Sequence, residues 1–460
     1  MTISAKKRIW GWMSFDWAAQ PYYTLGLTFI FGPYFAVVAA NYFLGQGLDQ
    51  EAAGASAQST WAFGQTCAGL VIAFTAPFLG AFADNTGRKM PWIIGFSLLY
   101  VIGAWSLWFL TPDSSSLMLF LILFYVGFIA AESALNFINA YLPSLGTPEE
   151  VGRISGTGAS FGYWGGLVAL IIMLLLFAED AQTGKTLIGL DPLFGLDPSA
   201  REGTRAVGPF MAVWFAIFMI PFFLWVRDNP ADAGEVPKMS KVWGDLKQTL
   251  RNVARRKSTA SFLLGSMFYR DALNALYAFG GVYATLVLGW GTIWLGVFGI
   301  ISVITAAVFT YVGGRFDAKL GPKPVIIFCI LCLLVVSTII VGMSRTQVFG
   351  VPLAADSMVP DIIFFVCGSV IGGAGGAIYA ASRSMMVRHT NPERPTEAFG
   401  LFALSGKATA FMAPLLIGVF TAWTGNVQLG FLPVIFLFLL GLVMLSWVNK
   451  DGDRAAWSAS

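Results

Sequence analysis

The sequence predicts an all-α polytopic membrane protein with twelve transmembrane helices, arranged as two six-helix pseudo-repeats. Three observations lead to this prediction: a strongly apolar composition, twelve long apolar stretches, and short motifs that recur in the two halves. Of the residues, 57% are hydrophobic and only 12% are charged, and the mean hydropathy is +0.71. A soluble domain carries about twice that share of charge.

The apolar stretches are long enough to cross a bilayer, whose core requires roughly 20 apolar residues per helix. Runs such as Leu167–Leu176 lack the period-two alternation of a membrane barrel. A helix is the other structure that satisfies its backbone in lipid. We place the spans at residues 17–40, 61–83, 90–110, 117–141, 154–177, 207–226, 262–288, 291–313, 324–343, 360–381, 398–421 and 428–448.

The basic residues indicate orientation and domain organisation. If the N-terminus is cytoplasmic, nearly all Lys and Arg fall in cytoplasmic segments. The positive-inside rule therefore predicts that both termini lie in the cytoplasm. We expect a multi-pass protein of a bacterial-type inner (plasma) membrane. The basic residues behind the net charge of +3 indicate orientation in the membrane. No other sequence feature supports binding of a nucleic acid. We expect an N-terminal half at 1–226, a cytoplasmic linker with a basic amphipathic helix at 227–260, and a C-terminal half at 261–460.

One motif occurs twice, each time at the end of an apolar span. Gly80–Lys89 follows the second span and Gly313–Lys323 follows the eighth. Each contains a glycine, an aspartate four residues later, then another glycine and a basic residue. The glycines permit close helix approach, and the aspartate can contact a basic residue or a helix N-terminus. We expect short loops that act as a conformational latch, with ordinary loop anchoring as the alternative. The latch residues are Gly80, Asp84, Gly87, Arg88, Asp317 and Gly321.

Ionisable groups inside the membrane are costly and commonly line a cavity or pair with one another. Glu132 lies inside the fourth predicted span, and Arg270 and Asp271 lie inside the seventh. Adjacent helical residues point about 100° apart, so Arg270 and Asp271 need not pair. A structural ion pair is the alternative for Glu132 and Asp271. The candidate cavity residues are Glu132, Asn136, Asn139, Arg270, Asp271, Asn274, Tyr379, Arg383 and Lys407.

Glu132 is also the candidate for ion coupling. A carboxylate in apolar surroundings has its charged form disfavoured, and no cation adjoins Glu132 in sequence, so we expect it to exchange a proton. The sequence lacks a phosphate-binding glycine loop with lysine, a zinc-binding His/Glu helix and a serine elbow. We therefore expect no enzymatic activity, no cofactor and no metal. The single histidine, His389, is expected in a solvated cytoplasmic loop.

These residues resemble one branch of the major facilitator superfamily. The branch is the family of the fungal vacuolar amino-acid effluxer linked to autophagy, with bacterial relatives once grouped as an unknown major facilitator family. The family usually has glutamine where Tyr379 stands, asparagine where Arg270 stands and arginine where Lys407 stands, so the substrate need not carry over. The matching stretches span nearly the whole chain: Trp12–Ala18, Asn139–Pro143, Gly152–Gly156, Phe279–Tyr283, Ser382–Ser384, Glu397–Leu401 and Leu404–Thr409.

The resemblance implies a secondary transporter that works by alternating access. We expect a monomer that exports a small polar solute, with amino acids or short peptides first, because opposite charges in the cavity suit a zwitterion. The alternatives are an organic-anion permease with Lys407 as the anchor, and a sugar permease. A membrane-embedded receptor or enzyme is the alternative from another class.

Overall fold

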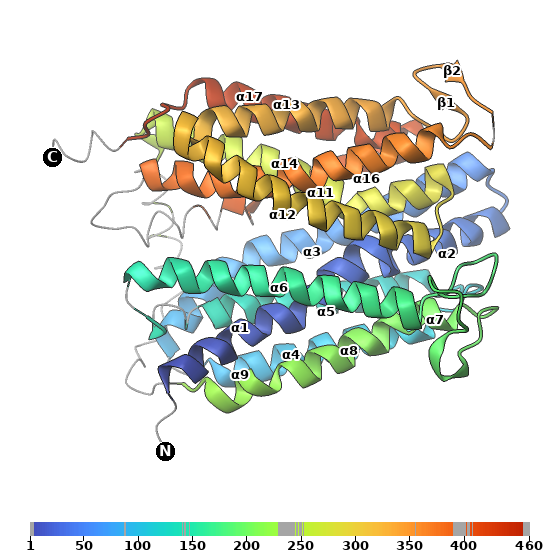
Figure 1. The fold of residues 1–460 in the computed structure, drawn as a ribbon, viewed down its shortest axis with the longest axis horizontal. Helices are drawn as coiled ribbons and strands as arrows, with labels where there is room; N and C mark the ends of the chain where they lie inside the picture. Colours follow the sequence, from blue (N-terminus) through green and yellow to red (C-terminus); the bar gives the residue numbers. More distant parts are fainter. Residues whose placement is uncertain are drawn as a thin grey trace. The chain divides into compact units, whose positions relative to one another are not determined.

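The computed structural model shows a chain of long helices joined by short connections (Figure 1). It describes residues 4–86, 89–139, 141, 144–146, 148–228, 244, 247, 251, 253–354, 356–389, 402, 405–406 and 408–453. Most of the predicted amphipathic linker helix, and the candidate residues Gly87, Arg88 and Lys407, lie outside these ranges. A short hairpin, β1 (Gln347–Val348) with β2 (Val351–Pro352), is the sheet within the described part.

The helices of the described part of the chain are consistent with the twelve predicted spans. Among the described residues, nine helical segments are long and apolar enough to cross a membrane, and Ser160–Leu176 and Met412–Thr424 are shorter apolar helices. The 37-residue helix α3 corresponds to the second predicted span. The first repeat consists of α1 (Ala5–Pro21) with a π-helical segment (Tyr22–Phe29) and α2 (Phe31–Gly45), α3 (Gln50–Thr86), α4 (Met90–Ser106), α5 (Leu117–Asn139), α6 (Pro148–Leu176), and α7 (Glu202–Arg205) with α8 (Val207–Phe218) and α9 (Ile220–Trp225). The second consists of α11 (Lys257–Leu288), α12 (Thr292–Leu320), α13 (Pro322–Val341), α14 (Val359–His389), α16 (Met412–Thr424) and α17 (Leu432–Ser446).

The helices group into two compact units. The first contains residues 1–47, 74–242 and 291–296, and the second contains residues 48–73, 243–290 and 297–460. Helices α3 and α12 each contribute one end to the first unit and the rest to the second.

In the first unit, α1 packs against α6, α8 and α9, and α4 packs against α5 and α8 (Figure 1). Glycines on α6 permit the close approach of α1. A Cβ at Gly158 would lie 2.7 Å from the Trp12 ring, and one at Gly165 would lie 2.8 Å from the Trp17 carbonyl oxygen. The glycine-bearing face of α6 is therefore the face that α1 covers.

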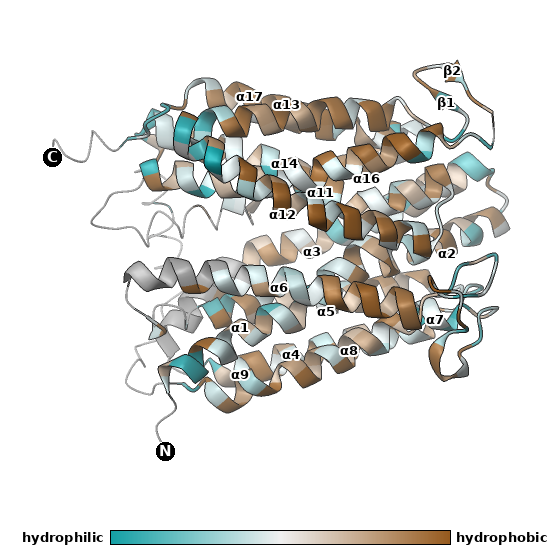
Figure 2. Cartoon of the chain, in the orientation of Figure 1, coloured by the Kyte–Doolittle hydropathy of each residue, from teal (hydrophilic) through white to brown (hydrophobic). Residues whose placement is uncertain are grey.

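The second unit repeats this pattern of neighbours. Helix α11, the first helix of its repeat, packs against α16 and α17, which correspond to the partners α6, α8 and α9 of α1. Helix α13, the third, packs against α14 and α17, which correspond to the partners α5 and α8 of α4. Equivalent helices of the two repeats therefore have equivalent partners. The outward faces of α13 and α17 are strongly apolar along most of their length, as lipid-facing helices require (Figure 2).

Two sequence expectations are wrong about local structure. The recurrent aspartate motif does not lie in short loops, because α3 continues to Thr86 and α12 continues to Leu320, so Gly80, Asp84 and Asp317 are helical. Among the motif residues that the structure describes, Gly321, at φ 86°, makes the expected turn. His389 is also not a solvated loop residue. It ends α14 with 2% of its surface exposed and stacks on Phe262.

Candidate functional site

The first unit holds a polar group where its first and fourth spans meet. The Tyr23 hydroxyl, in the π-helical segment, donates a 2.6 Å hydrogen bond to Glu132 Oε1 on α5. Asp16, two turns earlier on α1, faces α6, and a Cβ at Gly158 or Gly162 would lie 2.9 or 3.1 Å from Asp16 atoms. The glycines thus make room for an acidic side chain inside the helix pack.

The backbone of the first span is irregular at this group. Pro21 cannot donate a helical hydrogen bond, and the eight residues after it form π-helical turns that end at Ile30. Such widened turns occur frequently at functional sites. They bring Tyr23 to Glu132 while Tyr22 donates to the Phe124 carbonyl at 2.6 Å.

In the second unit, Arg270 and Asp271 contact different elements, as their helical spacing predicts. The Asp271 carboxylate is 3% exposed and accepts a 2.9 Å hydrogen bond from the backbone N–H of Ala413, in the first turn of α16. The chain turns at residues 409–411, so α16 begins inside the eleventh span. Asp271 therefore caps a helix whose N-terminal N–H groups would otherwise lie unpaired in the membrane.

Arg270 points toward aromatic groups. Its guanidinium lies 4.4 Å from the Phe402 ring centre and 5.7 Å from that of Tyr379, and its Nη1 donates to the Phe402 carbonyl at 3.1 Å. Its Nε is buried with no hydrogen-bond partner in the described part of the chain. None of the salt bridges between described residues involves Arg270.

Three predicted residues, Arg270, Asn274 and Tyr379, form one group in the second unit. Tyr379 on α14 donates a 2.6 Å hydrogen bond to Asn274 Oδ1, one turn from Arg270 on α11. Each unit therefore joins its first and fourth spans through a tyrosine hydroxyl, Tyr23 to Glu132 and Tyr379 to Asn274. Phe402 also contacts the Arg270 guanidinium, and sequence analysis missed it. An apolar side chain gives no signal that it contacts a cation 132 residues away.

The remaining candidates lie near these groups or at helix ends. Asn136 follows Glu132 by one turn of α5, and Arg383 follows Tyr379 by one turn of α14 and is exposed. Asn139 is exposed at the end of α5. Gly321 lies against the Arg388 side chain. A Cβ added at Gly321 would lie 3.2 Å from Arg388 Nη1.

A second feature that the sequence did not predict lies near the first aspartate motif. Asp228 accepts hydrogen bonds from the backbone N–H of Lys89 at 3.0 Å, that of Met90 at 3.1 Å, and the Tyr141 hydroxyl. Burial, and then the hydrogen bond to Asp228, raise the pKa of Tyr141, so its hydroxyl stays a donor. Asp228 thus fixes the start of α4. The sequence gives no local signal of this role, because the partners of Asp228 are more than 80 residues away.

The fold and its polar groups define a class of protein. A solved D-xylose–proton symporter matches with a TM-score of 0.64 at 14% identity, over 97% of this chain and 98% of that one. Together with the family and the bacterial relative reported below, this fold makes the chain a membrane transporter of the major facilitator type. It belongs to the family described as vacuole effluxer Atg22 like, whose model matches residues 4–456.

Relatives confirm the branch that the sequence motifs indicate. The chain is 24% identical to an uncharacterized MFS-type transporter, YxiO, of Bacillus subtilis, over 96% of this chain and 94% of that protein. It is 22% identical to autophagy-related protein 22 of Cryptococcus neoformans, over 66% of this chain. The chain spans about half the length of that fungal relative, with 51% of it covered.

Proposed function

We propose that the protein is a secondary transporter that exports a small polar solute bearing a carboxylate group, with amino acids or short peptides first. The observation that supports this most directly is Arg270. It is a cation inside a membrane span, stacked on Phe402, with a buried Nε–H that has no partner in the described part of the chain. A planar guanidinium with spare donors is suited to a carboxylate, which it can bind through two parallel hydrogen bonds.

The neighbours of Arg270 narrow the choice of solute. The Asp271 carboxylate is engaged by the Ala413 N–H, so in this arrangement it does not neutralise Arg270. The Tyr379 ring lies 5.7 Å from the guanidinium, and its hydroxyl donates to Asn274 Oδ1. An organic anion is the second candidate, because Arg270 alone would bind it.

Transport driven by an ion gradient completes the proposal. Proton coupling through Glu132 is our hypothesis for the energy source, and the family description, an effluxer, supports export.

We further propose that the repeats are an N-terminal half at 1–226 and a C-terminal half at 261–460 of a monomer with cytoplasmic termini. Labelling of Phe194→Cys and Lys247→Cys, at exposed positions on the two sides of the predicted topology, tests the orientation. Labelling of both from one side would contradict it.

Thermal stabilisation in detergent tests the role of Arg270. We expect amino acids or dipeptides to raise the melting temperature of the wild type and of Arg255→Gln, an exposed control in the same unit. Loss of one charge-assisted contact, about 1.5–3 kcal/mol, corresponds to roughly 10- to 100-fold weaker binding in Arg270→Gln. Arg270→Lys should be intermediate, because a lysine keeps the charge without the planar fork.

Two outcomes would change the proposed substrate. Stabilisation by dicarboxylates but not by amino acids would favour the organic-anion candidate. Stabilisation by sugars alone, equal in the wild type and in Arg270→Gln, would show that a carboxylate is not what the protein binds.

A further inference from the structure

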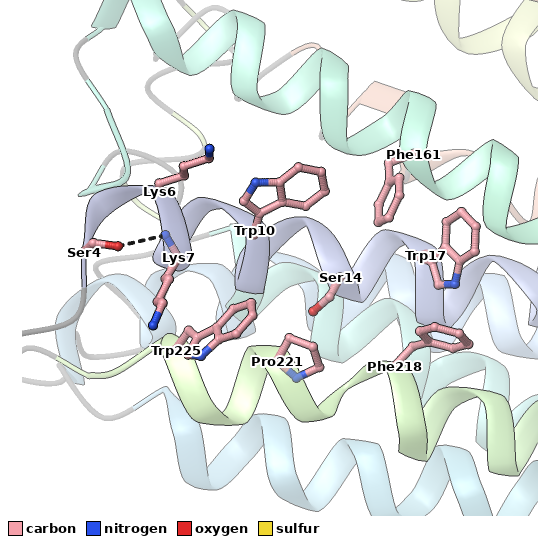
Figure 3. Close-up of a pocket in the computed structure, with 10 residues that line it drawn as sticks. All are labelled: Ser4, Lys6, Lys7, Trp10, Ser14, Trp17, Phe161, Phe218, Pro221 and Trp225. Atoms are coloured by element: carbon pink, nitrogen blue, oxygen red, sulfur yellow. Dashed lines mark hydrogen bonds between the residues drawn. The ribbon is translucent and has the colours of Figure 1, made fainter.

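The first unit has a groove on its surface between α1, α6 and α9 (Figure 3). Its volume is about 520 Å³. It is separate from the Glu132 and Arg270 groups, none of whose members lines it. Its walls are mainly large apolar side chains: Trp10, Trp17, Phe161, Phe218, Pro221 and Trp225.

The two ends of the groove differ in charge. Lys6 and Lys7, both exposed, lie at the end where α1 begins, and Figure 3 shows Trp10 and Trp225 next to them. Phe161, Trp17 and Phe218 line the other end. None of the lining residues is acidic. The groove therefore has a cationic end at Lys6 and Lys7 and an apolar remainder.

The dimensions of the groove match one leaflet of a membrane. It follows α1 from Lys6 to Trp17, eleven residues, or about 16 Å at 1.5 Å per residue. The hydrocarbon core of a bilayer is about 30 Å thick, so a single leaflet contributes about 15 Å. Tryptophan is enriched at the level of the lipid headgroups, and lysine side chains reach outward to the same level. In the structure the first membrane-spanning segment runs from Ala5 to Gly45 and so begins before the predicted residue 17, and Trp10, Trp225 and the lysine pair are thus at the depth where a headgroup lies.

We propose that this groove binds one anionic phospholipid. An acyl chain lies along the ring surface that Trp17, Phe161 and Phe218 form, and the headgroup phosphate lies at the Lys6 and Lys7 end of the groove. The Trp10 and Trp225 indoles pack at the glycerol level. The acyl chain requires the apolar walls, and the phosphate requires the lysines, so a zwitterionic lipid, whose headgroup carries its own cation, binds more weakly.

Native mass spectrometry of the purified full-length chain tests this site with phosphatidylglycerol and phosphatidylcholine as probes. The wild type should retain phosphatidylglycerol, about tenfold more tightly than phosphatidylcholine, since each lysine near an anionic headgroup strengthens binding severalfold. The double variant Lys6→Gln/Lys7→Gln should lose this preference. The control Lys319→Gln/Lys450→Gln changes net charge equally at exposed positions of the second unit and should keep it.

A second measurement reports on the apolar end of the groove. Phosphatidylglycerol with brominated acyl chains should quench tryptophan fluorescence in the wild type and in the control double variant, and less in Lys6→Gln/Lys7→Gln. The proposal fails if the wild type binds the two lipids equally or if the Lys6/Lys7 variant retains phosphatidylglycerol. It also fails if the groove is occupied by a second copy of the chain, seen as a lipid-free dimer.

Discussion

At the scale of single residues, Arg270 and Asp271 show how two adjacent charges serve different purposes. A helix directs neighbouring side chains about 100° apart, and Asp271 reaches the Ala413 N–H while Arg270 stacks on Phe402. Asp271 is a fixed structural acceptor in this arrangement. Arg270 keeps a donor that the described residues do not use. The sequence predicts that the two charges need not pair, but only the structure assigns their partners.

Glu132→Gln tests proton coupling. We expect loss of transport driven by a pH gradient, with equilibrium exchange of substrate intact, because glutamine accepts the Tyr23 hydrogen bond but carries no titratable proton. Asp113→Asn, at an exposed position, is the matched control and should transport normally. The measurement is solute flux in proteoliposomes with and without an imposed pH gradient. Full pH-driven flux in Glu132→Gln would make Glu132 a structural group.

Glu179, between α6 and α7, leads to a prediction about stability and pH. It is fully buried, its Oε1 lies 3.2 Å from Arg201 Nε, and it accepts from the Thr204 N–H and hydroxyl at 2.9 and 2.8 Å. Burial raises the pKa of Glu179 above the ordinary 4.5, although Arg201 and Thr204 oppose the shift. The folded state then binds more protons than the unfolded chain as pH rises above 4.5, so stability falls over that window.

Glu179→Gln should therefore flatten the decline of melting temperature above pH 4.5, even if the absolute melting temperature drops because Arg201 loses its partner. Asp191→Asn, in the same loop and exposed, should keep the wild-type slope. An unchanged slope in Glu179→Gln would mean that Glu179 does not titrate differently in the folded state.

At the scale of helices, the sequence predicts the spans well and their ends poorly. Hydropathy marks where a helix crosses the membrane, but a helix that continues into water needs no apolar side chains, so α3 and α12 run past the predicted boundaries. The same reason makes the aspartate motifs look like loops. The sequence does not show that His389 is buried, because its burial depends on the distant partners Ser258 and Phe262.

Glycines on α6 give a prediction for helix packing. Gly165→Ala should lower stability by about 1–3 kcal/mol, because its Cβ would lie 2.8 Å from the Trp17 carbonyl oxygen of α1, and backbone atoms cannot easily move aside. Gly95→Ala on α4, where nothing lies within 4 Å of an added Cβ, should be neutral or slightly stabilising. Thermal unfolding in detergent compares them. Equal stability of both variants would contradict the close α1–α6 contact.

At the scale of the whole molecule, the repeated pattern of helix neighbours agrees with the motifs that recur along the sequence. The first and seventh spans each contact the fifth and sixth helices of their own repeat, and each carries charged residues. Composition and repeats are enough to predict a twelve-helix transporter. The partners of Arg270 and the capping role of Asp228 are not predictable, because they join residues more than 80 positions apart.

Solute flux in proteoliposomes tests the central claim most directly. Liposomes loaded with amino acids, dipeptides, organic anions or sugars are compared for the wild type, Arg270→Gln and protein-free controls. We predict carboxylate-dependent flux above the controls in the wild type, and a loss of most of that flux in Arg270→Gln. Flux that never exceeds the protein-free controls for any of these solutes would contradict the account, as would carboxylate flux at the wild-type rate in Arg270→Gln.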